Sequence, residues 1–143
     1  MNNSTLEEVL VKDGVLYYSN VGDSMLPLIK EGLSILEIKS ISKKPQKYDI
    51  VLYKRNNGQY VLHRILKVRK NDYVMCGDNR WTKEKGIVDN QIIGILTKVI
   101  NGEKITITNM NDKSYRIYSH LWCDFFLVRA FILKMKYTIK KWT

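Results

Sequence analysis

The feature that most constrains the fold is a series of short apolar segments separated by turn-forming residues. Each segment is rich in Val, Ile, Leu and Tyr and is short for a helix, so we predict β-strands. Asn56-Asn57-Gly58 and Asn101-Gly102 contain residues that tolerate positive φ, and each is expected to close a hairpin. The centre of the chain is therefore predicted to be mainly antiparallel β. The predicted strands cover residues 15–21, 33–38, 48–54, 59–68, 73–76, 92–100 and 104–108.

Two helices are predicted, one at each end of the β-rich region. Ser4 and Glu7 have the spacing of a capping box, in which the hydroxyl and the carboxylate satisfy free backbone amides. A short helix is therefore expected to run to Asp13 and to stop at Gly14. From about Tyr115 the chain has no Gly or Pro and is too densely apolar for an alternating strand, so we predict one long helix there.

The predicted C-terminal helix combines an apolar stripe with a basic end. Such a helix most often covers one face of a sheet, and that is the expected arrangement. An anionic membrane surface or a partner protein in contact with residues 121–143 are the alternatives. We divide the chain into a β-rich domain over residues 1–112 and a basic amphipathic helical extension over residues 113–143. The stripe consists of Leu121, Phe125, Val128 and Ile132, and it is widened by Trp122, Phe126 and Leu133.

Composition and charge limit the function classes. The chain has 143 residues, of which 45% are hydrophobic, so one globular domain is expected. The net charge is +10, of which residues 1–60 contribute +1, residues 61–120 contribute +5 and residues 121–143 contribute +4. A charge spread in this way, without a recognised nucleic-acid-binding motif, gives no reason to expect a specific nucleic-acid partner. No cofactor and no metal ion are expected from the residues.

The same features favour a cytoplasmic protein. Cys76 and Cys123 are too few for a disulfide framework, which favours a reducing compartment. The sequence has no apolar run of about 18 residues and no basic N-terminal stretch followed by an apolar one, so neither a spanning helix nor a signal peptide is expected. A peripheral position on the inner face of the membrane is compatible with the basic C-terminal helix.

Three short segments, 22–27, 60–65 and 76–80, carry the residue types of a nucleophilic site. A serine hydroxyl becomes a competent nucleophile when an imidazole within reach takes its proton and an acid orients that imidazole. Ser24 follows Gly22 and precedes Pro27, a pattern typical of a sharp turn that exposes a side chain. Each residue alone also has a structural explanation: Ser24 can cap a turn, His63 can be half-buried in a strand, and Asp78 can bond to nearby backbone.

The order and spacing of these segments resemble a known family. Over residues 20–100 the chain is similar to the serine proteases that include type I signal peptidases and LexA-type repressors. The resemblance implies a twisted antiparallel β domain, with Ser24 as the nucleophile and His63 as the general base, as in signal peptidases of the Ser-His type. It implies Asp78 as the acid that orients the imidazole, with Glu84 and Asp89 as alternatives. The matching segments are Ser24-Met25-Leu26-Pro27, residues 48–53, residues 61–65, residues 77–80 and Ile93-Gly94.

Some residues depart from the family pattern. Gly22 stands where signal peptidases commonly have a hydroxyl residue, so an oxyanion hole would rest on backbone amides such as that of Ser24. Asp23 lies beside the nucleophile and is expected to point away from it. Only 23 residues precede Ser24 in this sequence. We therefore expect neither a membrane anchor nor a DNA-binding unit, and secretory signal peptides are not the expected substrates.

Two functions follow from these observations. The first is a serine endopeptidase that cleaves extended peptide or leader segments with a Ser-His pair. The alternative is a catalytically silent protease fold that binds a peptide or protein and docks through its basic C-terminal helix. The reactivity of Ser24 distinguishes them.

Overall fold

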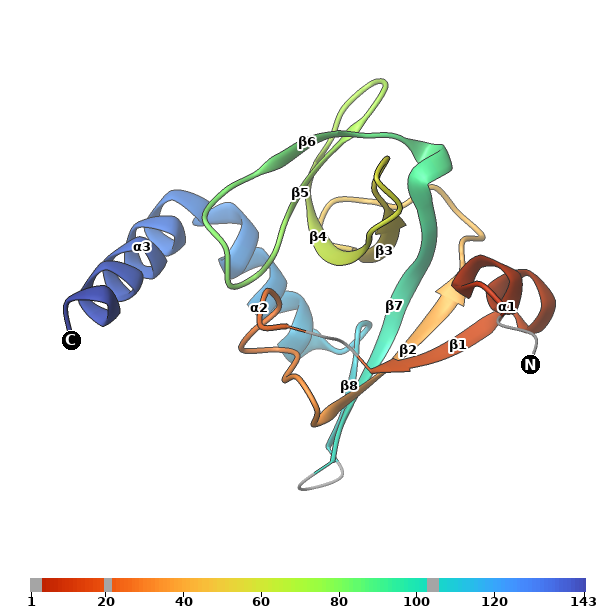
Figure 1. Cartoon of the computed structure of the whole chain (residues 1–143), viewed down its shortest axis with the longest axis horizontal. Helices are drawn as coiled ribbons and strands as arrows, with labels where there is room; N and C mark the ends of the chain where they lie inside the picture. The colour runs from red at the N-terminus through yellow and green to blue at the C-terminus, as the bar shows by residue number, and fades with distance from the viewer. Residues whose placement is uncertain (1–3, 20–21, 103–105) are drawn as a thin grey trace.

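A computed structural model describes residues 4–19, 22–102 and 106–143 of the protein (Figure 1). The described chain is mainly antiparallel β with a few helices, as the sequence predicts. The strands are β1 Val15–Ser19, β2 Ser34–Ser40, β3 Ile50–Lys54, β4 Tyr60–Val68, β5 Tyr73–Cys76, β6 Glu84–Ile87, β7 Ile92–Asn101 and β8 Thr106–Asn109. The helices are α1 Leu6–Asp13, the short 3₁₀ helix η1 Asp89–Gln91, α2 Lys113–Asp124 and α3 Phe126–Trp142.

All the described strands belong to one sheet, and β7 is its central element. The strand order is β1-β2-β7-β3-β4-β5-β6, and β8 also pairs with β7. Residues Gly94 to Asn101 of β7 pair with β2, whereas residues Ile92 to Ile95 pair with β3. Figure 1 shows β7 running from the β3–β6 half of the molecule to the half that contains β1, β2 and β8. This strand therefore joins the two halves of the sheet.

Two apolar clusters, one on each side of β3, make up most of the core, and a small third cluster contains Leu66, Cys76 and Cys123. The larger cluster contains Ile50 and Leu52 of β3 together with residues of α1, β2 and β7 and the buried Met25. The second contains Val51 and Tyr53 together with residues of β4, β5 and β6. Successive side chains of a strand point to opposite faces, so β3 supplies alternate residues to each cluster. Because both of its faces are buried, β3 reads as a continuous apolar run.

Both predicted hairpins are confirmed. β3 and β4 pair antiparallel around Asn56-Asn57-Gly58, and Gly58 has a φ of +88°, which glycine adopts without strain. β7 and β8 pair antiparallel on either side of the turn that begins at Asn101-Gly102. The predicted strand ends at Val21 and Lys104 lie outside the described residues.

Strand β6 is absent from the sequence prediction. Its four residues, Glu84-Lys85-Gly86-Ile87, have only one large apolar side chain, and they show no alternation that would indicate a strand. Pairing with β5 makes this segment a strand, with Tyr73 opposite Ile87 and Met75 opposite Glu84. The strand conformation of this segment thus depends on its pairing with β5, a tertiary contact that the sequence pattern does not contain.

The capping box of α1 is shifted by one residue from its predicted position. Thr5 is the N-cap instead of Ser4: its hydroxyl accepts from the Glu8 amide at 3.2 Å, and the Glu8 carboxylate accepts from the Thr5 amide at 2.9 Å. Both pairs have the required spacing, so spacing alone does not distinguish them. Glu7 instead accepts a hydrogen bond from the Tyr60 hydroxyl of β4 at 2.5 Å, a tertiary contact that favours the observed register.

The C-terminal segment forms two helices instead of the predicted single one. The break lies at Phe125, whose φ of −101° and ψ of 37° are outside the helical range. α2 turns Tyr115, Ser119 and Cys123 toward the β domain, and the first two bind the buried Arg64. The predicted apolar stripe therefore does not cover a sheet face, because polar contacts on another side of α2 set its orientation. The four stripe residues are between 48% and 60% exposed: Leu121, Phe125, Val128 and Ile132.

Candidate active site

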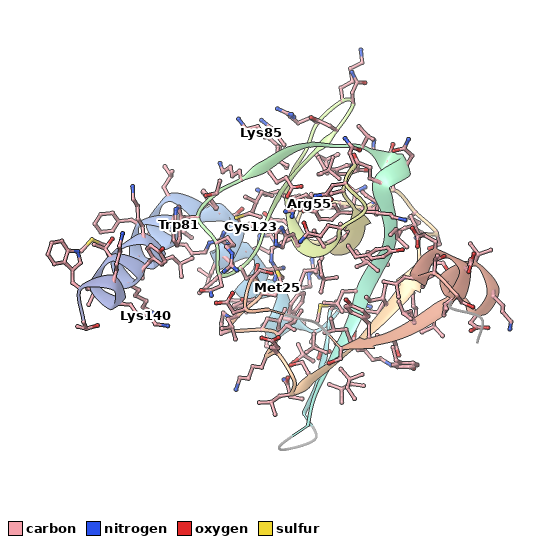
Figure 2. All side chains as sticks on the ribbon, in the orientation of Figure 1. Met25, Arg55, Trp81, Lys85, Cys123 and Lys140 are labelled. Carbon is pink, nitrogen blue, oxygen red and sulfur yellow. The ribbon has the colours of Figure 1, made fainter. Side chains whose placement is uncertain are left out.

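Ser24 lies in the turn between β1 and β2, beside a small cleft. The neighbouring Met25 is completely buried in the larger apolar cluster and anchors this turn (Figure 2). The Leu26 amide donates to the Asp23 carbonyl at 3.2 Å, which keeps the turn tight. Ser24 itself is partly exposed, and it lines a cleft of about 260 Å³ together with His63. Two residues that are distant in sequence, the predicted nucleophile and the predicted base, thus line the same cleft.

The loop 77–80 holds the Ser24 turn from the other side. The Asn79 amide donates to the Ser24 carbonyl at 2.8 Å, and the Asn79 side chain donates to the Asp23 carbonyl at 3.1 Å. The Arg80 guanidinium pairs with the Asp23 carboxylate at 2.7 Å and thereby lowers the pKa of Asp23. Asp23 is also one of the residues that line the cleft. The positive charge of Arg80 compensates its carboxylate beside the nucleophile.

Gly77 allows Ser24 and His63 to approach each other. A Cβ atom at position 77 would lie 2.6 Å from the Ser24 carbonyl oxygen and 3.1 Å from Nε2 of His63. A larger residue here would therefore separate the serine turn from the imidazole. Within the described part of the chain, no hydrogen bond joins the Ser24 hydroxyl to His63. In enzymes, catalytic hydrogen bonds are often long or unformed without substrate and tighten when substrate binds.

The other ring nitrogen of His63 belongs to a chain of hydrogen bonds. Nδ1 lies 3.3 Å from the Tyr53 hydroxyl, which donates to Oε2 of Glu84 at 3.0 Å. Arg55 donates to Glu84 at 3.0 and 2.5 Å and is the main cause that lowers the pKa of this carboxyl. An ionised Glu84 can only accept, so Tyr53 uses its one proton there. In a neutral imidazole, Nδ1 of His63 then donates to Tyr53, which leaves Nε2, the nitrogen near Gly77, without a proton.

Burial sets the protonation states of His63 and Tyr53 in this series of hydrogen bonds. Desolvation lowers the pKa of His63 to about 4, and the negative charge of Glu84 opposes this only in part. Burial also raises the pKa of Tyr53, and the charge of Glu84 raises it further. At neutral pH the site therefore contains a neutral imidazole and a protonated tyrosine. These are the states that the hydrogen-bond chain requires.

Asp78 has partners other than His63. Its carboxylate accepts from Nε of Arg64 at 2.8 Å and from Nη2 at 2.7 Å, and both side chains are fully buried. The Tyr118 hydroxyl donates to the same carboxylate at 2.8 Å. None of the hydrogen bonds described for Asp78 reaches the imidazole. Asp78 thus connects β4 to α2, and its sequence-predicted role as the acid that orients His63 has no direct contact to support it.

Of the two alternative acids, only Glu84 is connected to His63, through Tyr53. Asp89 accepts instead from the Tyr73 hydroxyl at 2.5 Å. The sequence alone does not identify Tyr53 as a site residue, because Tyr53 lies near the end of an apolar strand whose pattern is typical of the core. The hairpin register supplies a signal that could have found it: Val51 is opposite His63, so Tyr53 is a diagonal neighbour on the same face.

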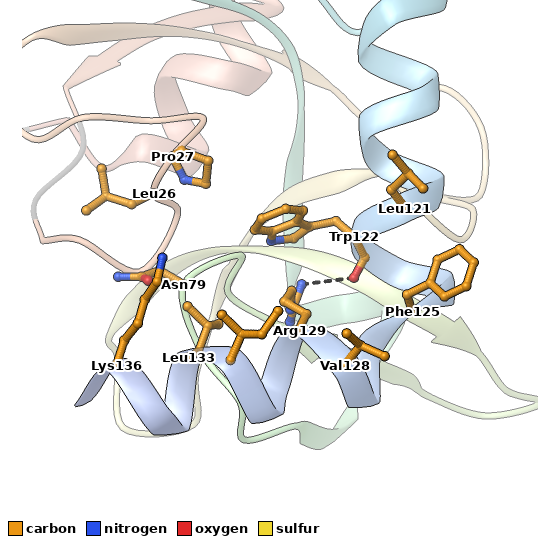
Figure 3. A pocket seen from close by; sticks show the side chains of 11 residues that line it. Leu26, Pro27, Asn79, Leu121, Trp122, Phe125, Val128, Arg129, Leu133 and Lys136 are labelled. Atoms are coloured by element: carbon orange, nitrogen blue, oxygen red, sulfur yellow. Dashed lines mark hydrogen bonds between the residues drawn. The ribbon is translucent and has the colours of Figure 1, made fainter. Parts of the chain in front are cut away.

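A larger apolar groove of about 470 Å³ lies beside the Ser24 turn (Figure 3). Leu26 and Pro27 form one side, and α2 and α3 form the other. Trp122 is fixed in this wall because its indole N–H donates to the Asp78 carbonyl at 2.7 Å. The predicted apolar stripe therefore lines a groove that adjoins the turn of the predicted nucleophile. The helix side contains Leu121, Trp122, Phe125, Val128, Ile132 and Leu133.

Neither a metal cluster nor a known relative identifies this site. In residues 4–19, 22–102 and 106–143, no group of three or more His, Cys, Asp or Glu side chains is arranged to hold a metal ion. None of the helices in those ranges combines the length and the apolar character needed to cross a membrane. Comparisons of the chain with protein-family models, with curated proteins and with solved structures found no match.

Proposed function

We propose that this protein is a serine endopeptidase of the signal-peptidase-like type, with Ser24 and His63 as its catalytic pair. The observation that carries the proposal is the orientation of His63. His63 and Ser24 line the same cleft, and Nε2 of His63 and the Ser24 carbonyl both adjoin Gly77, while Nδ1 lies 3.3 Å from the Tyr53 hydroxyl. The antiparallel β fold and the order of the sequence motifs support the same family, whose other members use a serine nucleophile with a nitrogen base.

In the proposed reaction, Ser24 Oγ attacks the carbonyl carbon of the scissile peptide bond, and its proton moves to Nε2 of His63. Glu84 stabilises the resulting imidazolium through Tyr53. Backbone amides hold the oxyanion, and the Ser24 amide donates to no other group within the described residues. The C–N bond then breaks as His63 returns the proton to the leaving amine. Water, activated by the same imidazole, hydrolyses the acyl-enzyme.

The proposed substrate is an extended peptide, such as a cytosolic leader segment. Residues Tyr60 to His63 of β4 pair with β3 on one side. β5 pairs with β4 only from Arg64 onward, so no described strand covers the other edge of residues 60–63. The same residues line the cleft that contains Ser24. A peptide that adds to this edge as a further strand would bring a carbonyl group to the nucleophile.

We include the predicted cytoplasmic location in the proposal. Cys76 and Cys123 are both buried in the same small cluster and are free thiols. A reducing compartment keeps such thiols from forming a disulfide.

Labelling with a fluorophosphonate probe, which reacts with activated serines, tests the proposal. We expect the wild type to be labelled and Ser24→Ala to lose the label. His63→Gln should react at least about 100-fold more slowly than the wild type, because general-base catalysis is removed. Ser114→Ala is the matched control, since it removes an exposed serine of α2, and it should be labelled like the wild type. Equal labelling of the wild type and Ser24→Ala would contradict the proposal.

The alternative function is a catalytically silent binding module. One observation favours it: the Ser24 hydroxyl and His63 share no hydrogen bond in the described part of the chain. Incubation with a library of extended peptides separates the two functions. A peptidase produces new peptide termini that Ser24→Ala does not produce, whereas a module retains intact peptides equally well with Ser24 or Ala at this position.

A further inference from the structure

Helix α3 docks on the β domain by one side only. Arg129 is buried there, and its guanidinium donates to the Arg80 carbonyl at 3.1 Å. Leu133, one turn later, is partly buried. Tyr137, a further turn along, packs on Trp81 with ring centroids 5.3 Å apart. Residues four apart lie on one face of a helix, so Arg129, Leu133 and Tyr137 define the docked side.

The opposite side of α3 presents large apolar residues to solvent. Leu127, Phe131 and Trp142 are 81%, 66% and 85% exposed. At about 100° per residue they fall, with three other exposed residues, in an arc of about 120°. We call this surface the apolar arc. Its other members are Val128, Met135 and Ile139.

Basic residues border the apolar arc on both sides. By helical position, Lys134 and Lys141 lie within about 40° of one edge of the arc, and Lys136 lies about 60° beyond the other edge. Lys140 falls on the docked side, between Arg129 and Leu133. Residues 125–143 contain no acidic residue. A second copy of this chain would bring lysines against lysines, so self-association through this face is electrostatically unfavourable. An anionic lipid surface matches both properties, because it accepts apolar side chains below its negative headgroups.

We propose that α3 lies in the surface of an anionic lipid bilayer. Its apolar arc enters the acyl boundary, and its lysine ammonium groups remain at the level of the phosphates. Figure 1 shows α3 projecting from the β domain toward the C-terminus, and Figure 2 shows Lys140 near that end. This attachment does not depend on the reactivity of Ser24. It places the bilayer next to the groove formed by α3 and the Leu26-Pro27 turn.

Co-sedimentation with lipid vesicles tests the attachment. We expect the full chain to bind vesicles of mixed phosphatidylcholine and phosphatidylglycerol at least about tenfold more tightly than vesicles of phosphatidylcholine alone, and to lose this preference in high salt. The double variant Phe131→Ser/Trp142→Ser should bind the anionic vesicles at least about tenfold more weakly, because it removes two of the largest side chains of the apolar arc. The variant Lys134→Gln/Lys141→Gln should reduce the preference for anionic vesicles.

Val11→Ser is the matched control, because it removes an 88% exposed apolar residue from α1, away from α3. It should bind the vesicles like the wild type, and circular dichroism should show every variant folded. Equal binding to anionic and neutral vesicles would overturn the proposal, as would unchanged binding of the Phe131/Trp142 variant. A vesicle-free dimer that this variant dissociates would assign the apolar arc to a second copy and would overturn it too.

Discussion

His63 shows how burial determines chemistry at the scale of a single residue. An exposed imidazole has a pKa of about 6.5 and is partly protonated near neutral pH. Desolvation lowers the pKa of His63 to about 4, so the ring stays neutral and Nε2 is free to accept a proton. The negative charge of Glu84, which is connected to the ring through Tyr53, stabilises the protonated imidazole and so offsets part of this lowering of the pKa.

The lowered pKa of His63 predicts a dependence of stability on pH. Between about pH 6.5 and pH 4 the unfolded chain protonates this imidazole and the folded chain does not, so a falling pH favours unfolding. His63→Gln cannot take the proton. The free energy of unfolding of the wild type, relative to this variant, should therefore be constant above about pH 7 and fall by up to about 3 kcal/mol by pH 4. Urea unfolding across this range measures the difference, and parallel curves for the two proteins would contradict it.

Helix α2 contacts the β domain through buried polar groups as well as through apolar side chains. Arg64 of β4 donates to the Tyr115 and Ser119 hydroxyls at 2.8 and 3.1 Å. The carboxylate of Asp78, its ion-pair partner, accepts from the Tyr118 hydroxyl at 2.8 Å. Apolar periodicity identifies a helix and its stripe, but it contains no information about a buried ion pair on another face. For this reason the sequence predicts that this segment is helical, but it predicts neither the break at Phe125 nor the orientation of α2.

This network predicts a large effect of Asp78 on stability. Asp78→Asn leaves the Arg64 guanidinium buried without a counter-charge, and we expect a loss of about 3–5 kcal/mol in the free energy of unfolding. Asp89→Asn is the matched control, because its carboxylate is exposed and accepts from one tyrosine, and it should cost much less. Urea unfolding followed by circular dichroism measures both losses. Similar small losses in the two variants would contradict the structural role of Asp78.

The whole molecule depends on β7, which pairs with strands of both halves. Gly94 of β7 pairs with Ser40 of β2, and a Cβ atom there would be 2.6 Å from Cγ2 of Ile38 and 3.0 Å from the Lys39 carbonyl oxygen. Gly94→Ala should therefore cost about 1–3 kcal/mol, and it should shift one cooperative transition rather than split it. Gly102→Ala, whose Cβ would meet its nearest neighbour at 3.3 Å, should cost less. Urea unfolding compares the two, and equal losses would contradict this role of Gly94.

The sequence by itself determined the β-rich fold, the N-terminal helix and both hairpins, because these depend on local periodicity and turn chemistry. It also nominated Ser24 and His63 through the order of short motifs. Only the tertiary structure decided that Glu84, by way of Tyr53, stands behind His63, and that Asp78 pairs with Arg64 instead. It also decided that the apolar side of α3 stays exposed. Such choices depend on which distant segments pack together, and burial and charge pairing there set the role of each side chain.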